Sequence, residues 1–239
     1  MLSPRELFPD LLPNLRDLGG MTTKDSRVLR RRQLLRSAAL VHTAEAAADV
    51  VTAHVGPATY ADLRTDVEVE RDGEPRALLD RGWTWRRVPI QDKRKDDTGN
   101  NPDDLLSRYR VHLPLYAAAA AQVASSLRRG PVLVACSLGK DRTGLVVALL
   151  LSWLGVNRAD VVADFVLSNP CLARGRHLLP ARWQDPRRQI GQATGWVCAQ
   201  MLDGIDADCY GVPSTAGIDA VRQTVLVVRR QTRLEANAP

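Results

Sequence analysis

The segment VLVACSLGKDRTG, residues 132–144, constrains this chain more than any other part of the sequence. A short apolar run rich in β-branched residues ends at Cys136, and a glycine-containing loop follows as far as Arg142. Thr143 and Gly144 then open an apolar stretch of helical composition. This order predicts a buried strand, a tight loop and the N-terminus of a helix, with a thiol before the loop and a guanidinium after it.

Such a loop is suited to holding an anion. The first backbone N–H groups of a helix have no partner within the helix, and the helix dipole adds partial positive charge there. Arg142 can hold two phosphate oxygens with its planar fork, and positive surroundings favour the nucleophilic thiolate of Cys136. The segment therefore predicts phosphoryl transfer through a cysteinyl-phosphate. The alternative is a buried structural cysteine with an arginine at the surface.

The spacing of Cys and Arg is weak evidence by itself, because the chain has 4 cysteines and 29 of its 33 basic residues are arginine. The preceding strand, the glycines at 139 and 144 and the hydroxyl after Arg142 raise its weight. An ATP-binding Walker A loop is excluded, because it requires glycine at 134 and Ser or Thr at 141, where this chain has Val and Asp.

The motif and four other segments together resemble a known family. SLGKDRTG after Cys136 is similar to the signature loop of the bacterial cysteine-dependent tyrosine phosphatases of tyrosine phosphatase family 3, which includes dual protein and phosphoinositide phosphatases. The resemblance implies phosphotyrosine or phosphoinositide-like substrates. One departure is Ala135, where the family usually has a histidine that shapes the loop. The other matching segments, in order, are NLRDLGG (14–20), LRSAAL (35–40), DLRTDVE (62–68) and DFVLSN (164–169).

Strand and helix signals alternate along the chain, which is typical of an α/β fold with a mostly parallel central sheet flanked by helices. We expect one domain over 1–239, with a core at about 13–170 and a lid and C-terminal helices at about 170–235. Residues 169–186 carry three prolines and are expected to form a lid-like connection. The expected strands are 37–41, 59–65, 84–90 and 131–135, and the expected helices are 44–54 (capped by Thr43), 103–112, 114–129, 143–154, 158–167, 187–202 and 214–233.

The second catalytic group is a general acid that protonates the leaving group. Asp92 follows the strand ending at residue 90, and the resemblance implies the acid at that place. Asp96 and Asp97 are rivals on the same polar loop, and all three residues are also compatible with solvated loop charge.

Other residues are expected to bind substrate or brace the pocket. Thr143 either donates its hydroxyl to the sulfur or caps the helix. The resemblance implies an additional phosphate near Lys140, and it places Arg64 at the pocket wall, although Arg64 has Asp62 and Asp66 as alternative partners. The resemblance also assigns pocket bracing to Asn14, Arg16 and Asp17. The expected phosphate-binding residues in the motif are Ser137, Leu138, Gly139, Lys140, Asp141, Thr143 and Gly144.

Composition limits the remaining classes of function. The net charge of +6 has its densest clusters at 30–32 and 93–95, without interleaved aromatic residues, which favours a solvated basic face over nucleic-acid binding. The four cysteines have no metal-ligand spacing, and neither a metal nor an organic cofactor is expected. The longest apolar stretch, 145–156, is too short to span a bilayer, and the N-terminus has no signal-peptide pattern, so we expect a cytoplasmic protein.

Two alternatives to a phosphotyrosine or phosphoinositide phosphatase acting in signalling stay open. The first is a phosphatase for a small metabolite, such as a nucleotide or sugar phosphate. Ala135, and a C-terminal half that departs from the pattern of the family, favour this alternative. The second is a catalytically inactive phosphate-binding module, although the presence of Cys136, Arg142 and Asp92 together argues against it.

Overall fold

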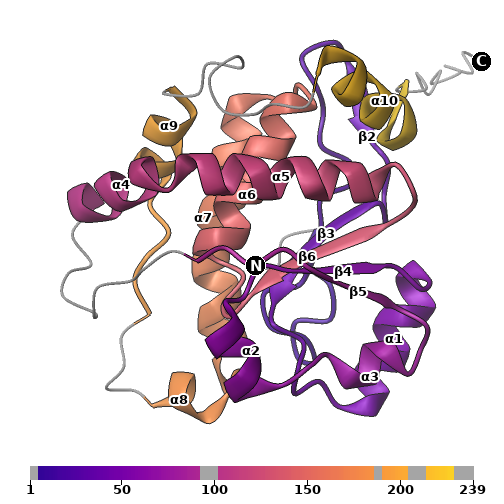
Figure 1. The fold of residues 1–239 in the computed structure, drawn as a ribbon, viewed down its shortest axis with the longest axis vertical. Coiled ribbons are helices and arrows are strands. Elements are labelled where there is room, and N and C mark those ends of the chain that lie inside the picture. The colour runs from indigo at the N-terminus through magenta and orange to yellow at the C-terminus, as the bar shows by residue number, and fades with distance from the viewer. Residues whose placement is uncertain (1–4, 92–101, 186–189, 204–213, 229–239) are drawn as a thin grey trace, which may run out of the picture.

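The computed structural model describes residues 5–91, 102–185, 190–203 and 214–228. Its centre is a five-stranded sheet with the order β1-β3-β6-β4-β5 (Figure 1). Strands β3 (Leu34–Ala38), β6 (Val132–Cys136), β4 (Thr59–Asp62) and β5 (Thr84–Arg87) are parallel. The short β1 (Arg16–Asp17) pairs antiparallel with β3. The predicted α/β class with a mostly parallel sheet is confirmed.

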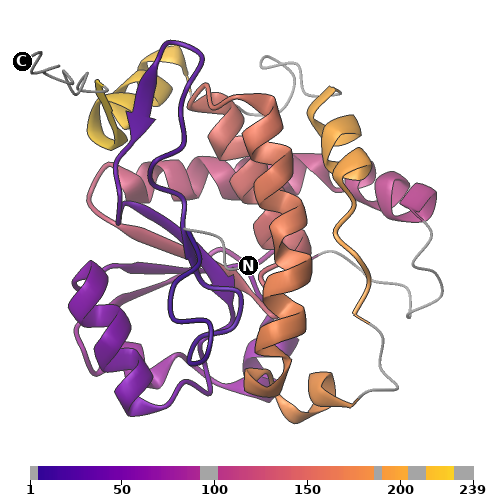
Figure 2. The same cartoon turned by 180° about the vertical axis from the view of Figure 1, so that it is seen from behind.

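Helices cover both faces of the sheet (Figures 1 and 2). One face packs against α1 (Glu45–Val55) and α3 (Arg76–Leu79). The larger apolar core lies on the other face, between the sheet and a layer of longer helices. That layer contains α4 (Pro102–Val111), α5 (Leu113–Leu127), α6 (Asp141–Trp153), α7 (Arg158–Arg174), α9 (Gly195–Asp203) and α10 (Thr215–Val225).

Strand β6 is buried along its whole length, and its side chains alternate between the two faces. Val132, Val134 and Cys136 belong to the core on the α6 side, whereas Leu133 and Ala135 belong to the core on the α1 side. Neighbouring residues of a strand point to opposite faces. Consequently the methyl group of Ala135 and the side chain of Cys136 lie on opposite faces of the sheet, and the methyl group has an apolar environment.

Several element boundaries differ from the sequence prediction. Helix α1 is preceded by Ala44 as its N-cap, without a side-chain cap from Thr43. The expected connection at 169–186 is largely helical: α7 continues to Arg174 with Pro170 inside it, and η1 (Gly175–Leu178) and α8 (Ala181–Gln184) follow. The strand expected at 37–41 is observed as β3 at Leu34–Ala38, and the strand expected at 84–90 is observed as β5 and ends at Arg87. The helix expected over 187–202 is observed as α9, which begins at Gly195, and residues 186–189 lie outside the described residues.

The C-terminal helix is shorter than predicted. Helix α10 ends at Val225, and the β-branched run after it forms β7 (Leu226–Val228). This strand pairs antiparallel with β2 (Arg27–Leu29), so a long-range partner overrides the helical prediction for residues 226–228, and residues 229–233 of the predicted helix lie outside the described residues.

Strand β4 ends at Asp62, before the end of the strand expected at 59–65, and a short helix, α2 (Asp66–Asp72), follows with Thr65 as its N-cap. The hydroxyl of Thr65 accepts from the N–H of Glu68, and the N–H of Thr65 donates to the Glu68 carboxylate at 2.8 Å. This capping box fixes the first turn of α2 beside the carboxyl end of β4.

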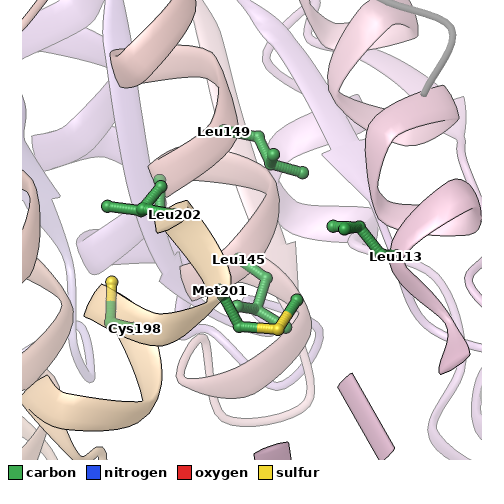
Figure 3. Close-up of a pocket in the computed structure, with 7 residues that line it drawn as sticks. Leu113, Leu145, Leu149, Cys198, Met201 and Leu202 are labelled. Carbon is green, nitrogen blue, oxygen red and sulfur yellow. The ribbon is translucent and has the colours of Figure 1, made fainter. Parts of the chain in front are cut away.

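One enclosed apolar cavity lies between the start of α5, α6 and α9, and Figure 3 shows its lining. Its volume is about 10 Å³, which is no larger than one water molecule needs. It is therefore a packing defect of the core and not a ligand site. Among the described residues, no helix has both the length and the apolarity to cross a membrane.

Candidate active site

The motif folds as predicted, into a strand, a loop and a helix. Strand β6 ends at Cys136, residues 137–140 form the loop, and α6 begins at Asp141. We call residues 137–140 the phosphate loop. Cys136 is only 2% exposed and lies at the carboxyl end of β6, where it meets the first turn of α6. Parallel sheets bind ligands at this edge.

The carbonyl groups of the phosphate loop are all held by the protein. The carbonyl of Ser137 accepts from the N–H of Ala39 at 3.4 Å, and that of Leu138 accepts from Nδ2 of Asn14 at 2.9 Å. Arg36 donates through Nη2 to the carbonyl of Gly139 at 2.7 Å.

These contacts orient the loop's N–H groups. A trans peptide directs its N–H opposite to its C=O, so the N–H groups of residues 138–140 point away from the bracing residues. Within the described parts of the chain, none of these three N–H groups has an acceptor. The loop therefore presents consecutive donors on one side, as an anion-binding nest does.

Two glycines let this loop approach its neighbours. Gly139 has φ of 65°, and a Cβ there would lie 2.1 Å from the carbonyl oxygen of Ser37. At Gly144 a Cβ would lie 2.7 Å from the ring of Phe165. The N–H of Gly144 donates to the carbonyl of Lys140 at 2.9 Å. Gly144 thus closes the helix turn and permits close packing, and a substrate contact of Gly144 stays a prediction.

Arg142 is buried, and its guanidinium forms a two-pronged ion pair with Glu68 of α2. Nη1 donates to Oε2 at 2.5 Å and Nη2 donates to Oε1 at 2.7 Å. The hydroxyl of Ser137 also donates to Glu68 Oε1 at 2.5 Å. Nη1 of Arg142 also donates to the carbonyl of Leu63, at the end of β4, at 3.3 Å.

Sequence reasoning missed Glu68 as a site residue. Burial alone would raise the pKa of its carboxyl, but the hydrogen bonds and positive charge of Arg142 outweigh burial and hold that pKa well below its ordinary value. The available signal was the capping-box pattern of Thr65 and Glu68, which predicts where the carboxylate sits on α2. Its pairing with Arg142, 74 residues later, depends on the tertiary fold.

Lys140 and Asp141 form a polar cluster with Tyr109 of α4. The ammonium of Lys140 donates to Asp141 Oδ1 at 2.5 Å, and the hydroxyl of Tyr109 donates to the same oxygen at 2.5 Å. Lys140 is 4% exposed. Its charge is directed to Asp141, at the positive end of the α6 dipole, where a carboxylate is stabilising.

The hydroxyl of Thr143 is buried and has no hydrogen-bond partner among the described residues. It does not cap α6, whose N-cap position is Lys140 and lacks a side-chain cap. The capping alternative for Thr143 is therefore not observed.

Arg64 is fully buried and pairs with Asp62 at 2.7 Å, and it also donates to the carbonyl of Gly73 at 3.0 Å. Of the alternative partners open in the sequence, the structure has the ion pair with Asp62, and a substrate contact of Arg64 at the pocket wall stays a prediction.

The expected general acid lies outside the described residues, as do its rivals Asp96 and Asp97. The chain leading to Asp92 is described as far as Gln91, whose amide donates to Asp66 of α2 at 3.1 Å. Arg87 of β5 donates to the other oxygen of Asp66 at 2.7 Å. The described chain before the polar loop therefore ends, at Gln91, beside the helix that carries Glu68.

The segment after α7 packs against the phosphate loop. Leu138 belongs to a small apolar cluster with Ala38, Leu172 and Leu179, and Trp183 of α8 packs on it. Arg182 of α8 also forms a two-pronged ion pair with Asp72 of α2, at 2.7 and 2.6 Å. Two short helices, α2 and α8, thus flank the site.

Comparisons with known proteins agree with this geometry. A model described as "tyrosine phosphatase family" matches residues 10–224. The triple specificity protein phosphatase PtpB of Mycobacterium tuberculosis is 30% identical over 190 residues, covering 65% of this chain and 66% of that protein. A tyrosine-protein phosphatase of Nostoc commune is 30% identical over 142 residues, covering 56% of this chain and 47% of that protein.

The chain spans about two thirds or less of the length of these relatives. The crystal structure of TpbA from P. aeruginosa superposes with a TM-score of 0.44 at 17% identity, covering 92% of this chain and 96% of that one. The family model, in contrast, spans nearly the whole sequence, including the strand, loop and helix described above. The chain belongs to the tyrosine phosphatase family.

Proposed function

We propose that this protein hydrolyses phosphomonoesters through a cysteinyl-phosphate, with phosphotyrosine or phosphoinositide-like substrates. The observation that carries the proposal is the phosphate loop, whose carbonyls are held by Ala39, Asn14 and Arg36, so that the N–H groups of residues 138–140 are turned away from these partners. The family match over residues 10–224 supports the reaction type and supports one phosphatase domain for this part of the chain.

In the first step the Cys136 thiolate attacks phosphorus and the ester P–O bond breaks. The leaving oxygen takes a proton from Asp92, and Arg142 with the loop N–H groups holds the phosphoryl oxygens. In the second step Asp92 takes a proton from water, the water oxygen bonds to phosphorus, and the S–P bond breaks to return the thiolate and inorganic phosphate. No step in this scheme requires a metal or an organic cofactor.

We further propose a reducing, cytoplasmic location and a phosphorylated substrate as the partner. The three described cysteines, Cys136, Cys171 and Cys198, are free thiols, which suits a reducing compartment. Nucleic acid has no part in the proposal.

The test is turnover of an aryl phosphate by wild type and by Cys136→Ser, followed by phosphotyrosine peptides, phosphoinositides and small phosphomonoesters. Cys136-dependent hydrolysis of peptides or phosphoinositides supports the proposal. Activity on small metabolites alone would reassign the substrate class. Phosphate binding without turnover of any ester by wild type would indicate a binding module.

The acid is tested separately. Asp92→Asn, Asp96→Asn and Asp97→Asn are compared on aryl phosphates of graded leaving-group acidity. We expect only Asp92→Asn to lose most on the poorest leaving group, because there the transferred proton matters most. An unchanged dependence in Asp92→Asn, with loss in one of the other two, would move the acid to that residue.

A further inference from the structure

A completely buried arginine lies directly behind the phosphate loop. Arg36 of β3 is paired in register with Val134 of β6, two residues before Cys136. Its Nη2 donates to the carbonyl of Gly139 at 2.7 Å and, at 3.4 Å, to that of Lys140. Its Nη1 donates to the carboxylate of Asp164 on α7 at 2.6 Å. One guanidinium therefore connects the loop backbone to a helix outside the motif.

Asp164 is shared with a second buried arginine. Arg16 of β1 donates through Nε to Asp164 at 2.8 Å, and Ser168 accepts from Arg16 at 3.0 Å and from Arg36 at 3.3 Å. Both guanidiniums are unexposed, and the Asp164 carboxylate is 1% exposed. Arg5 lies 3.8 Å from the same carboxylate.

This arrangement is costly as a purely structural device. Desolvation makes buried ion pairs weak stabilisers, so packed apolar residues serve a core as well or better. Burial, aided by the nearby Arg16, lowers the pKa of Arg36 to about 10, and Arg36 remains charged at neutral pH. The two arginines outnumber Asp164, so the cluster carries excess positive charge. That charge lies next to a loop whose proposed ligand is a phosphate.

Only Arg36 of the two arginines touches the loop. Arg16 contacts Asn14, Asp164 and Ser168, whereas Arg36 fixes the carbonyl of Gly139. Because the peptide is trans, this contact turns the N–H of Lys140 toward the side where phosphate is proposed to bind. Gly139 has a left-handed φ, one of several backbone conformations open to glycine, so contacts such as this one select the conformation of the loop.

We propose that Arg36 is the positioning residue of the phosphate loop: by clamping the Gly139 carbonyl to Asp164, it keeps the loop N–H groups aimed at phosphate before substrate arrives. The inference rests on the proposed function, since it assigns a role within the same site. Arg36 contacts neither the sulfur nor the substrate, and its effect is exerted through the backbone.

The test compares Arg36→Lys with Arg81→Lys. Both substitutions keep the charge and remove a planar fork from an ion pair. Arg81 pairs with Asp49 and Glu45 of α1, which packs on the face of the sheet opposite to Cys136. A lysine ammonium at 36 cannot reproduce the flat bridge between Asp164 and the loop carbonyl. Three quantities are measured: the Kd for inorganic phosphate by calorimetry, the kcat/KM for good and poor aryl leaving groups, and the Tm.

We expect Arg36→Lys to raise the phosphate Kd about 10-fold, as loss of one charge-assisted hydrogen bond implies, and to lower kcat/KM by the same factor for both leaving groups. Arg81→Lys is expected to change the phosphate Kd by less than about 3-fold, and the Tm of each variant reports whether it remains folded. Equal effects on phosphate Kd in the two variants, or no effect in Arg36→Lys, would overturn the inference.

Two further outcomes keep the test decisive. If Arg36→Lys does not fold, Arg36→Gln removes the bridge from the Gly139 carbonyl to Asp164, while Asp164 keeps its ion pair with Arg16. A raised phosphate Kd at near wild-type Tm then supports the inference, and an unchanged Kd overturns it. If wild type itself neither binds phosphate nor hydrolyses any ester, the proposed function has failed, and the result is distinct from failure of the Arg36 assignment.

Discussion

The pair between Glu68 and Arg142 gives the sharpest prediction. The Glu68 carboxylate accepts from Arg142 Nη1 and Nη2, from the hydroxyl of Ser137 and from the N–H of Thr65. Glu68→Gln keeps the shape and supplies one acceptor oxygen in place of two. Two of the four contacts are therefore lost, and an NH₂ group is turned toward donors.

The magnitude follows from burial. Removing one partner of a buried ion pair costs about 3–5 kcal/mol, and the Glu68 side chain is 18% exposed, so we take the lower end, about 3 kcal/mol. Freed from Glu68, Arg142 is less well oriented for phosphate. We expect kcat/KM on an aryl phosphate to fall about 30-fold, which corresponds to about 2 kcal/mol of transition-state stabilisation.

Urea unfolding and steady-state kinetics measure the two effects, and Glu70→Gln is the matched control. Glu70 lies on the same helix and is exposed, so its substitution should change stability by no more than about 0.5 kcal/mol. If Glu68→Gln binds phosphate more tightly and turns over faster, Glu68 competes with phosphate for Arg142, and the orienting role is refuted.

The same pair has a defined pH dependence. The native pKa of Glu68 is below the ordinary value of 4.5, so its contribution is fully present above that value and is lost as pH falls toward the native pKa. The stability difference between wild type and Glu68→Gln should therefore shrink in acid and stay constant at neutral pH.

Three other predictions follow from the site and its surroundings. Gly139→Ala should abolish turnover and destabilise the protein by more than about 2 kcal/mol in urea unfolding, because the added Cβ would lie 2.1 Å from a backbone carbonyl oxygen; wild-type stability would contradict the loop geometry. Burial raises the pKa of Cys171 to about 11 and that of Cys198 to about 12, so neither thiol should react with iodoacetamide in the native protein at pH 8, as mass spectrometry can check; these native thiols keep their protons above pH 9 while unfolded ones ionise, so stability should fall as pH rises there. Tyr109→Phe removes a donor to Asp141 and should cost about 1–2 kcal/mol in the same unfolding assay, and a neutral effect would argue against that hydrogen bond.

The motif could be predicted from the sequence because its physics is local. A β-branched run before Cys136 and an apolar run after Arg142 set the strand and the helix, and the glycine between them permits the turn. These signals need no knowledge of distant residues, and the structure places the three elements accordingly.

The partners of the motif could not be predicted in the same way. Glu68 pairs with Arg142 across 74 residues, Arg36 donates to the Gly139 carbonyl across 103, and Asp164 pairs with Arg36 across 128. The sequence does not distinguish a buried arginine from a solvated one, and this chain has many arginines. β7 was predicted as helix for a similar reason, since only its pairing with β2 makes it a strand. The role of Asp92 stays a prediction.

The pairing of β2 with β7 joins residue 27 to residue 228, and the backbone N–H of Arg30 adds a bond to the carbonyl of Val225. In the sequence, nearly all of the described chain, including the phosphate loop, lies between the two strands of this small sheet. During synthesis, β2 leaves the ribosome long before β7, and it has no strand partner until residues 226–228 have also emerged. Closing so large a loop costs conformational entropy, and the stabilising contacts between β2 and β7 form only after that cost has been met. We therefore expect the β2–β7 pair to form late, after the other elements of the described chain have been synthesised.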